Sequence, residues 1–197
     1  MKSMKDMIEV LRLVKERAPL VQCITNFVTV NDCANIILAA GGSPAMTQDI
    51  REVEEAVGNV QALVCNLGAV GYAESMILAG KAARRLGKPV VFDPVGVGGT
   101  RLRQSIARRL LEEVQVSVIR GNASEIRWLA GEQTRGSGVD ASLTDAVTEE
   151  NLPLAARLAR GLAERTGSVV VVSGEIDLVT DGRRTAAFRN GCATMAR

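Results

Sequence analysis

The sequence predicts an α/β fold in which helices and strands alternate around a mainly parallel sheet. Short apolar runs rich in β-branched residues recur along the 197 residues and are typical of buried strands. Helical-period segments separate most of these runs, and a helix between two strands joins parallel neighbours by a right-handed crossover. With 47% apolar and 23% charged residues, the chain can bury the core of one domain. We therefore expect a single domain over residues 1–197.

The N-terminal part of the chain is predicted to contain two helices and a strand. Apolar residues recur at helical spacing over residues 4–17, so we expect an amphipathic helix whose methionines, Met4 and Met7, lie in the core. A strand over residues 20–25 follows. The next helix, over residues 31–40, ends at two consecutive glycines, which favour a left-handed helix cap.

Strands and helices alternate most regularly in the middle of the chain. Apolar runs bounded by turn residues predict the strands, and longer segments of helical period predict the helices. The predicted elements are a helix over residues 49–57, a strand over 62–65, a helix over 73–86, a strand over 90–92, a helix over 102–114 and a strand over 116–120. This order predicts parallel strands whose carboxyl ends share one edge of the sheet.

The C-terminal part begins with a short helix after Glu125 and a long polar loop over residues 132–151. A helix over residues 152–165 leads into a highly apolar strand over 168–172. Two further runs flank Asp181-Gly182, which predicts a β-hairpin with a two-residue turn. The strands of this hairpin are residues 176–180 and 183–188.

Composition excludes several classes of function. The chain has no histidine, which removes Ser-His-Asp and Cys-His hydrolase chemistry and His-ligated zinc. Its 24 basic and 22 acidic residues are spread along the sequence, so we expect no nucleic-acid partner. No segment resembles a signal peptide or a membrane span, so we expect no membrane partner either. Four widely spaced cysteines favour reduced thiols in a cytoplasmic protein; they are Cys23, Cys33, Cys65 and Cys192.

Candidate site residues gather around two predicted strand ends. Asp93 with Pro94 ends one apolar strand, and the glycine-rich turn over residues 96–100 then offers backbone N–H groups to an anion. Arg120 ends the next strand, and Asn122 can cap a helix that carries Glu125 on its first turn. Carboxylates and amides suit Mg²⁺, and phosphoryl transfer relies on positioning and charge rather than on histidine. This placement predicts a site that handles phosphate.

Each of these residues also has a structural explanation. The turn over residues 96–100 matches neither the dinucleotide fingerprint nor a P-loop, and a purely structural turn explains it as well. Asp-Pro is a common turn element, so Asp93 can serve the fold alone. Glu125 can simply complement the helix dipole, with Arg120 as its ion-pair partner.

Three residues nearer the N-terminus have ordinary structural roles when spacing alone is considered. Asn26 and Asn31 flank a turn and suit capping or turn formation better than ligand contact. Met46 follows a short apolar segment and would by default fill a gap in the core.

Seven short motifs add a resemblance to a known family. In chain order they are Ile24-Thr25-Asn26, Ser43-Pro44-Ala45-Met46, Asn66-Leu67-Gly68, Asp93-Pro94-Val95-Gly96, Ile119-Arg120-Gly121-Asn122 with Glu125, Gly138-Val139-Asp140 and Ser173-Gly174-Glu175. Together they closely resemble hydroxyethylthiazole kinase, and the match covers nearly all of the chain. The resemblance implies a ribokinase-like three-layer α/β fold. It also implies phosphorylation of the hydroxyl of 4-methyl-5-(2-hydroxyethyl)thiazole with ATP and Mg²⁺, in thiamine biosynthesis or salvage.

The same resemblance implies roles for individual residues. Met46 would contact the thiazole, and Asn26 matches another position on the substrate side. Arg120 and Ser173 would contact ATP. Family members resemble trimers with active sites between subunits, so a homotrimer is implied. The carboxylates on the Mg²⁺ and phosphate side would be Asp93 and Glu125.

In one respect the chain departs from the family pattern. The family's Gly-x-Gly-Cys loop, which carries the catalytic residue, is expected soon after Arg197, where this chain ends. Cys192 lies outside such a pattern, so the catalytic residue stays unassigned. We therefore expect a kinase domain that is incomplete at its C-terminus, exposes apolar surface on the sheet and has weakened or absent turnover.

These expectations leave more than one function open. The first is an ATP-dependent thiazole kinase. The alternative is a catalytically impaired protein that binds thiazole or nucleotide without turning over. A third, another vitamin kinase of the same superfamily, is disfavoured by Met46 within its Ser-Pro-Ala-Met motif.

Overall fold

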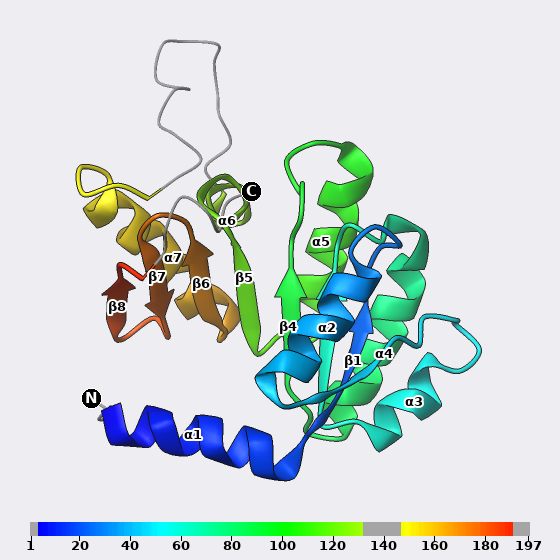
Figure 1. Ribbon diagram of the computed structural model, residues 1–197. Helices are drawn as coiled ribbons and strands as arrows, with labels where there is room; N and C mark the ends of the chain where they lie inside the picture. Colours follow the sequence, from blue (N-terminus) through cyan, green and yellow to red (C-terminus); the bar gives the residue numbers. More distant parts are fainter. Residues whose placement is uncertain (1–3, 132–146, 191–197) are drawn as a thin grey trace.

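The computed structural model describes residues 4–131 and 147–190, which form one eight-stranded sheet with helices packed against it (Figure 1). The strands are β1 (Leu20–Ile24), β2 (Ser43–Ala45), β3 (Ala62–Asn66), β4 (Val90–Asp93), β5 (Val118–Asn122), β6 (Val169–Ser173), β7 (Asp177–Thr180) and β8 (Thr185–Phe188). Their order in the sheet is β2-β1-β3-β4-β5-β6-β7-β8. Pairing is parallel from β2 to β6 and antiparallel in β6-β7-β8. The predicted α/β class with a mainly parallel sheet is confirmed.

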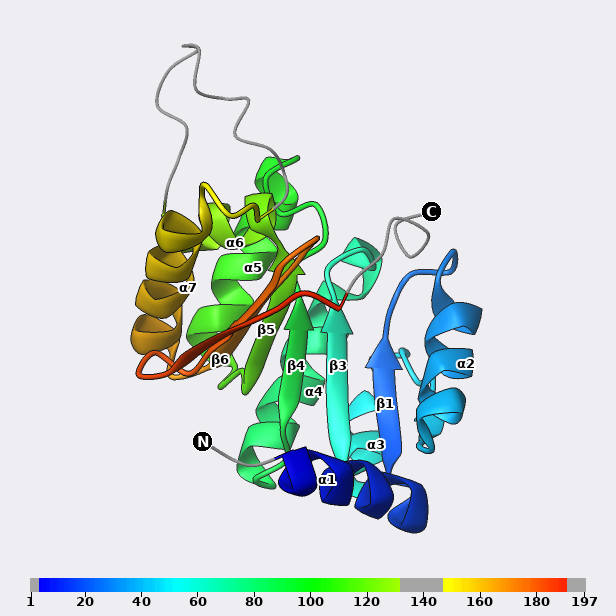
Figure 2. The ribbon, with the colours of Figure 1, turned by 60° about the vertical axis from the view of Figure 1, so that its left-hand side comes forward.

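The helices connect successive strands and cover mainly one face of the sheet. They are α1 (Met4–Arg17), α2 (Val30–Ala40), α3 (Val53–Asn59), α4 (Ala73–Arg85), α5 (Arg101–Glu113), α6 (Ala123–Ala130) and α7 (Leu152–Thr166), with the 3₁₀ helix η1 at Val70–Tyr72. Figure 2 shows α3, α4 and α5 behind the central strands, with α2 beside β1 at the opposite edge from β6. Because these strands are parallel, their carboxyl ends lie together at one edge of the sheet.

The two faces of the sheet differ in burial, because side chains alternate between faces along each strand. On the face covered by α3 to α7, the central strands contribute fully buried residues that include Leu63, Phe92, Ile119 and Val170. On the other face, a row of valines is only half-buried: Val64, Val91, Val118 and Val169. The core thus lies on the helix-covered side, and apolar surface is exposed on the open side.

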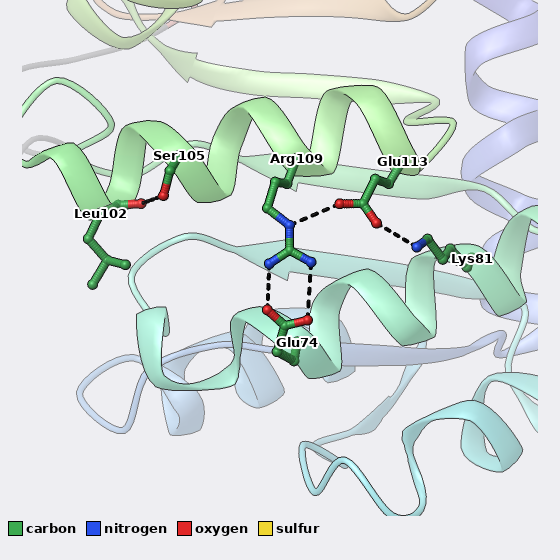
Figure 3. Close-up of polar contacts among 6 residues, drawn as sticks. All are labelled: Glu74, Lys81, Leu102, Ser105, Arg109 and Glu113. Atoms are coloured by element: carbon green, nitrogen blue, oxygen red, sulfur yellow. Dashed lines mark hydrogen bonds and ion pairs between the residues drawn. The ribbon is translucent and has the colours of Figure 1, made fainter.

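A network of four charged residues ties α4 to α5 on the outer surface (Figure 3). Arg109 of α5 donates two hydrogen bonds to Glu74 of α4 and a third to Glu113. Glu113 in turn accepts a hydrogen bond from Lys81 of α4. Single exposed ion pairs contribute little, but a network with a bidentate arginine restricts how two helices can move against each other. The C-terminal half of α5 is therefore anchored to α4.

The prediction that the methionines of the first helix lie in the core is wrong for Met7. Its side chain is 51% exposed, and Ile8 and Leu11 on the same stripe are 60% and 63% exposed. Helical periodicity identifies an apolar face but does not specify a surface that covers it. In the single chain this stripe of α1 faces solvent.

The predicted boundaries shift where local hydrogen bonds compete with regular structure. The helix expected from residue 49 begins at Val53, because the Asp49 carboxylate accepts hydrogen bonds from the N–H and the guanidinium of Arg51 in a preceding turn. The strand expected over residues 116–120 is β5, two residues later, and its last residue, Asn122, pairs with β6.

The hairpin turn is longer than predicted. β7 and β8 are joined by the four residues 181–184 rather than by Asp181-Gly182 alone, because Thr180 pairs with Thr185. Asp181 closes the turn: its carboxylate accepts hydrogen bonds from the backbone N–H groups of Arg183 and Arg184. Asp181, which predicted a two-residue turn, therefore stabilises a four-residue turn.

Two neighbouring residues of β5 provide a test of the difference between the two faces. Ile119→Ala removes a fully buried side chain and should lower the free energy of unfolding by about 2–5 kcal/mol. Val118→Ala removes a smaller, half-exposed side chain and should lower it by less than about half as much. Urea unfolding of both variants measures the difference, and equal losses would contradict the assignment of an open face.

Candidate active site

Parallel pairing brings polar residues from the ends of neighbouring strands to one edge of the sheet. In the register, Asn66 of β3 lies beside Asp93 of β4, and Asn122 of β5 lies beside Ser173 of β6. Asn66 Nδ2 donates a hydrogen bond to Asp93 Oδ2 at 2.8 Å, and the N–H of Leu67 donates to the Asp93 carbonyl at 2.9 Å. The ends of β3 and β4 are thus joined through both side chains and backbone.

The surroundings of Asp93 raise its pKa from the ordinary 3.8 to about 6. Burial of the carboxylate is the main cause; the positive charge of Arg120 lowers the pKa, and the negative charge of Glu125 raises it. Hydrogen bonds from Asn66 and from the N–H of Val95 lower it further. Asp93, Arg120 and Glu125 are therefore close enough to interact electrostatically. At neutral pH the Asp93 carboxylate is mainly ionised and able to attract a cation.

Glu125 holds two segments of backbone together. Its Oε2 accepts a hydrogen bond from the N–H of Asn122 at 2.9 Å, while Asn122 Oδ1 accepts one from the N–H of Glu125 at 2.9 Å, forming a capping box at the start of α6. Its Oε1 accepts a hydrogen bond from the N–H of Gly96 at 3.0 Å. The glutamate therefore connects the loop after β4 to the helix after β5.

The glycine-rich segment after Asp93 is a compact turn that only particular residues can form. The N–H of Val97 donates to the Pro94 carbonyl at 3.0 Å, and the N–H of Gly99 donates to the Gly96 carbonyl at 2.9 Å. Gly96 has φ +65°, a conformation that disfavours other residues. Thr100 then caps α5 by accepting a hydrogen bond from the N–H of Arg103. These contacts within the protein account for the geometry of the turn, as expected if its role is purely structural.

The loops after β1 and β3 are also in close contact. Asn26 Oδ1 accepts hydrogen bonds from the N–H groups of Val28 and Thr29, which is the turn role that spacing predicts. A Cβ atom at Gly68 would lie 2.6 Å from Asn26 Nδ2 and 2.5 Å from Asn66 Oδ1. Only glycine at this position allows the two asparagines to approach each other.

The remaining candidates lie farther along the same edge of the sheet. Met46 is half-buried just after β2, three strand spacings from Asp93, or about 14 Å. Ser173 ends β6, where its hydroxyl donates to the Gly121 carbonyl at 3.3 Å. Arg120 is exposed on the open face of β5. The structure thus brings Asp93, Arg120 and Glu125 together and leaves Met46 and Ser173 toward the two sides.

Sequence reasoning missed Arg103, on the first turn of α5. Its Nη1 donates hydrogen bonds to the carbonyls of Leu67 and Val95, at 2.9 and 2.8 Å. The available signal was a cation in the first turn of a helix, where the helix dipole disfavours positive charge.

Two predicted features fall outside the described residues. These are the Gly138-Val139-Asp140 motif and Cys192. Over residues 4–131 and 147–190, no helix is both long enough and apolar enough to cross a membrane.

The raised pKa of Asp93 has a consequence for stability. Since the folded pKa of about 6 exceeds the ordinary value near 4, ionised Asp93 destabilises the fold at high pH, and this effect disappears as the pH falls through 6 toward 4. Asp93→Asn should therefore raise the free energy of unfolding by about 1–3 kcal/mol at pH 8, and progressively less at lower pH. Urea unfolding in metal-free buffer at several pH values measures this difference.

A matched control is Asp49→Asn. The hydrogen bond and charge of Arg51 lower the pKa of Asp49, so this variant should gain no stability at pH 8. A gain from Asp93→Asn that does not change with pH would show that its cause is not the ionisation of the carboxylate.

Comparison with known proteins identifies the family. The model of the hydroxyethylthiazole kinase family matches residues 11–197. The hydroxyethylthiazole kinase of Desulfovibrio desulfuricans is 53% identical over 191 residues, which cover 96% of this chain and 67% of the relative. That of Clostridium acetobutylicum is 45% identical over 191 residues, covering 96% of this chain and 70% of the relative.

Solved structures agree with this result. The hydroxyethylthiazole kinase from Pyrococcus horikoshii superposes with a TM-score of 0.85 at 39% identity, over 98% of this chain and 70% of that one. The adenosine kinase of Trypanosoma brucei brucei, at 11% identity and a TM-score of 0.52 over 95% of this chain and 67% of that one, shares the ribokinase-like fold alone. From the family match, the identities and the superposition together, we conclude that this chain belongs to the hydroxyethylthiazole kinase family.

Proposed function

We propose that the chain is an ATP-dependent kinase that phosphorylates the hydroxyl of 4-methyl-5-(2-hydroxyethyl)thiazole in thiamine biosynthesis or salvage. The main support for this proposal is family membership, including 53% identity to a relative named for this activity. It favours a kinase over the alternative of a protein that only binds its ligands. We also propose that residues 1–197 belong to a single domain, since one sheet runs through the described residues.

In the proposed reaction, the hydroxyl oxygen of the thiazole alcohol bonds to the γ-phosphorus of ATP. The bond between that phosphorus and the β,γ-bridging oxygen breaks, and ADP leaves with its electron pair. The hydroxyl proton is lost, and the residue that accepts it is not assigned. Such a transfer needs mainly correct positioning and stabilisation of negative charge.

Several strand-end residues suit the two substrates. Arg120, exposed beside Asp93, offers a guanidinium to phosphate oxygens, and Ser173 on the neighbouring strand offers a hydroxyl. Met46 offers a half-buried thioether to the thiazole ring, with Asn26 on the same side of the sheet. The thiazole would then bind toward β2 and the nucleotide toward β5 and β6.

The carboxylates of the site can supply part of the coordination shell of Mg²⁺. Among the described residues, no cluster of three or more His, Cys, Asp or Glu side chains could hold a metal. Mg²⁺ nevertheless commonly binds through one or two carboxylates, water and substrate phosphates. Asp93 is mainly ionised at neutral pH, and each oxygen of Glu125 accepts a backbone hydrogen bond and has a second lone pair that can bind a cation. We infer that these two residues hold Mg²⁺, which would neutralise phosphate charge.

We further propose that the chain forms a homotrimer. The segment around α2 exposes large apolar side chains, with Phe27 at 90%, Val28 at 71%, Ile36 at 67% and Leu38 at 56% exposure, and α2 contains no buried residue. Such a helix normally packs against another surface. A neighbouring subunit would bury it beside the loop that carries Asn26.

The activity can be tested by coupled measurement of ADP release with ATP and Mg²⁺. We expect release that depends on the thiazole alcohol, and a thiazole phosphate ester detectable by mass spectrometry. Arg120→Met should raise the KM for ATP about tenfold, since a charge-assisted hydrogen bond to phosphate contributes roughly 1.5–3 kcal/mol. Thiazole binding without any ester formation would instead support the binding-only alternative.

The assembly can be tested by light scattering after size exclusion. The unmodified chain should elute as a trimer at micromolar concentration, and Ile36→Asp should elute as a monomer, because a carboxylate would be buried in the interface. Leu86→Asp is the matched control, since Leu86 is 53% exposed just after α4, away from α2, and should leave the trimer intact. An unmodified chain that is monomeric throughout would refute the proposal.

A further inference from the structure

Arg103 occupies an unusual position between two loops of the candidate site. It lies on the first turn of α5, half-buried, and its N–H is fixed by the Thr100 hydroxyl. One nitrogen, Nη1, donates to the carbonyl of Leu67 at 2.9 Å and to that of Val95 at 2.8 Å. These acceptors belong to different loops, after β3 and after β4. A single guanidinium nitrogen therefore bridges two strand ends.

The two acceptors are next to the groups that form the site. Leu67 follows Asn66, which is hydrogen-bonded to the carboxylate of Asp93. Val95 lies two residues after Asp93 and directly before Gly96, and a Cβ atom at Gly96 would lie 3.7 Å from Nη1 of Arg103. The guanidinium thus lies against the turn that follows Asp93.

The position of this arginine runs against a local preference. A positive charge in the first turn of a helix is disfavoured by the helix dipole, by roughly 0.3–1 kcal/mol. The hydrogen bonds to the carbonyls of Leu67 and Val95 compensate for this unfavourable interaction, but only while the two loops keep both carbonyls within reach of Nη1. Residues that depart from such a local preference are common at functional sites.

Arg103 and Glu125 hold the same loop from opposite sides. Glu125 accepts a hydrogen bond from the N–H of Gly96, and Arg103 donates to the carbonyl of Val95, so both polar groups of the Val95–Gly96 peptide bond are fixed. Without Arg103, that peptide would keep one attachment instead of two. The carbonyls of Leu67 and Val95 would both lose a charged partner.

We propose that Arg103 is a positioning residue for phosphoryl transfer: it sets the placement of Asp93 by clamping the loops after β3 and β4. This inference rests on the proposed kinase function. Its effect falls on the phosphate side of the site, because Met46 lies just after β2, and two strands separate β2 from β4. Loss of the clamp should therefore affect kcat much more than the KM for the thiazole.

The test compares Arg103→Met, Arg103→Lys and Arg108→Met. Arg108→Met removes an exposed cation from the same helix, where it lies 5.4 Å from the ring centre of Trp128, and serves as the matched control. We expect Arg103→Met to lower kcat by about 10–100-fold, as misplacement by about 1 Å can do, with the thiazole KM within about twofold. The ammonium of Arg103→Lys can donate to both carbonyls, so the kcat of this variant should be at least about fivefold higher than that of Arg103→Met.

Amide hydrogen exchange provides a readout that does not need activity. The N–H groups of Leu67 and Gly96, which donate to Asp93 and Glu125, should exchange at least about tenfold faster in Arg103→Met, while that of Ile119 in β5 should not change. Arg108→Met should leave all three rates and kcat unchanged.

Two results would overturn the proposal. One is an unaltered kcat in Arg103→Met, or a loss that falls equally on kcat and the thiazole KM and is not recovered by lysine. The other is unaltered exchange at Leu67 and Gly96. Absence of turnover in the unmodified chain would refute the proposed function instead, and the exchange rates would then decide whether Arg103 clamps the loops.

Discussion

Parallel register from β1 to β6 is the constraint on which both the core and the candidate site depend. Side chains alternate along a strand, so the last core residue of each strand is followed directly by a polar residue on the other face. A slip of one residue in β4 would turn Asp93 toward the helices and Phe92 toward water. The pairs that obey this rule are Cys65 with Asn66, Phe92 with Asp93, Gly121 with Asn122 and Val172 with Ser173. Burial of the first member therefore positions the second.

Two residues of opposite charge then fix the loops that emerge from this edge. Arg103 takes backbone carbonyls and Glu125 takes backbone N–H groups, so neither depends on a side chain of the neighbouring loop. Gly121 allows the glutamate to approach, because a Cβ atom there would lie 2.9 Å from Glu125 Oε2. Arg103 and Glu125 therefore position the loops through their backbone.

Much of the fold was predictable because its signals are local. Strand–helix alternation, the Asn122–Glu125 cap and the Asn26 turn each depend on residues a few positions apart. The contacts of Arg103 reach Leu67, 36 residues away, and no local pattern encodes such a separation. The same limit explains the error at Met7, since periodicity cannot name the surface that covers a stripe. Met46 carried no local signature and was identified only through resemblance.

The exposed apolar segment around α2 has a further thermodynamic meaning. Side chains such as Phe27 and Ile36 contribute little to the stability of one chain while they remain in water. Any surface that covers them adds roughly 25 cal/mol for each Å² of apolar area removed from water. By mass action, folding is then linked to the concentration of whatever binds there. Where a second copy is that partner, the melting temperature becomes a property of the solution's protein concentration and not of the isolated chain.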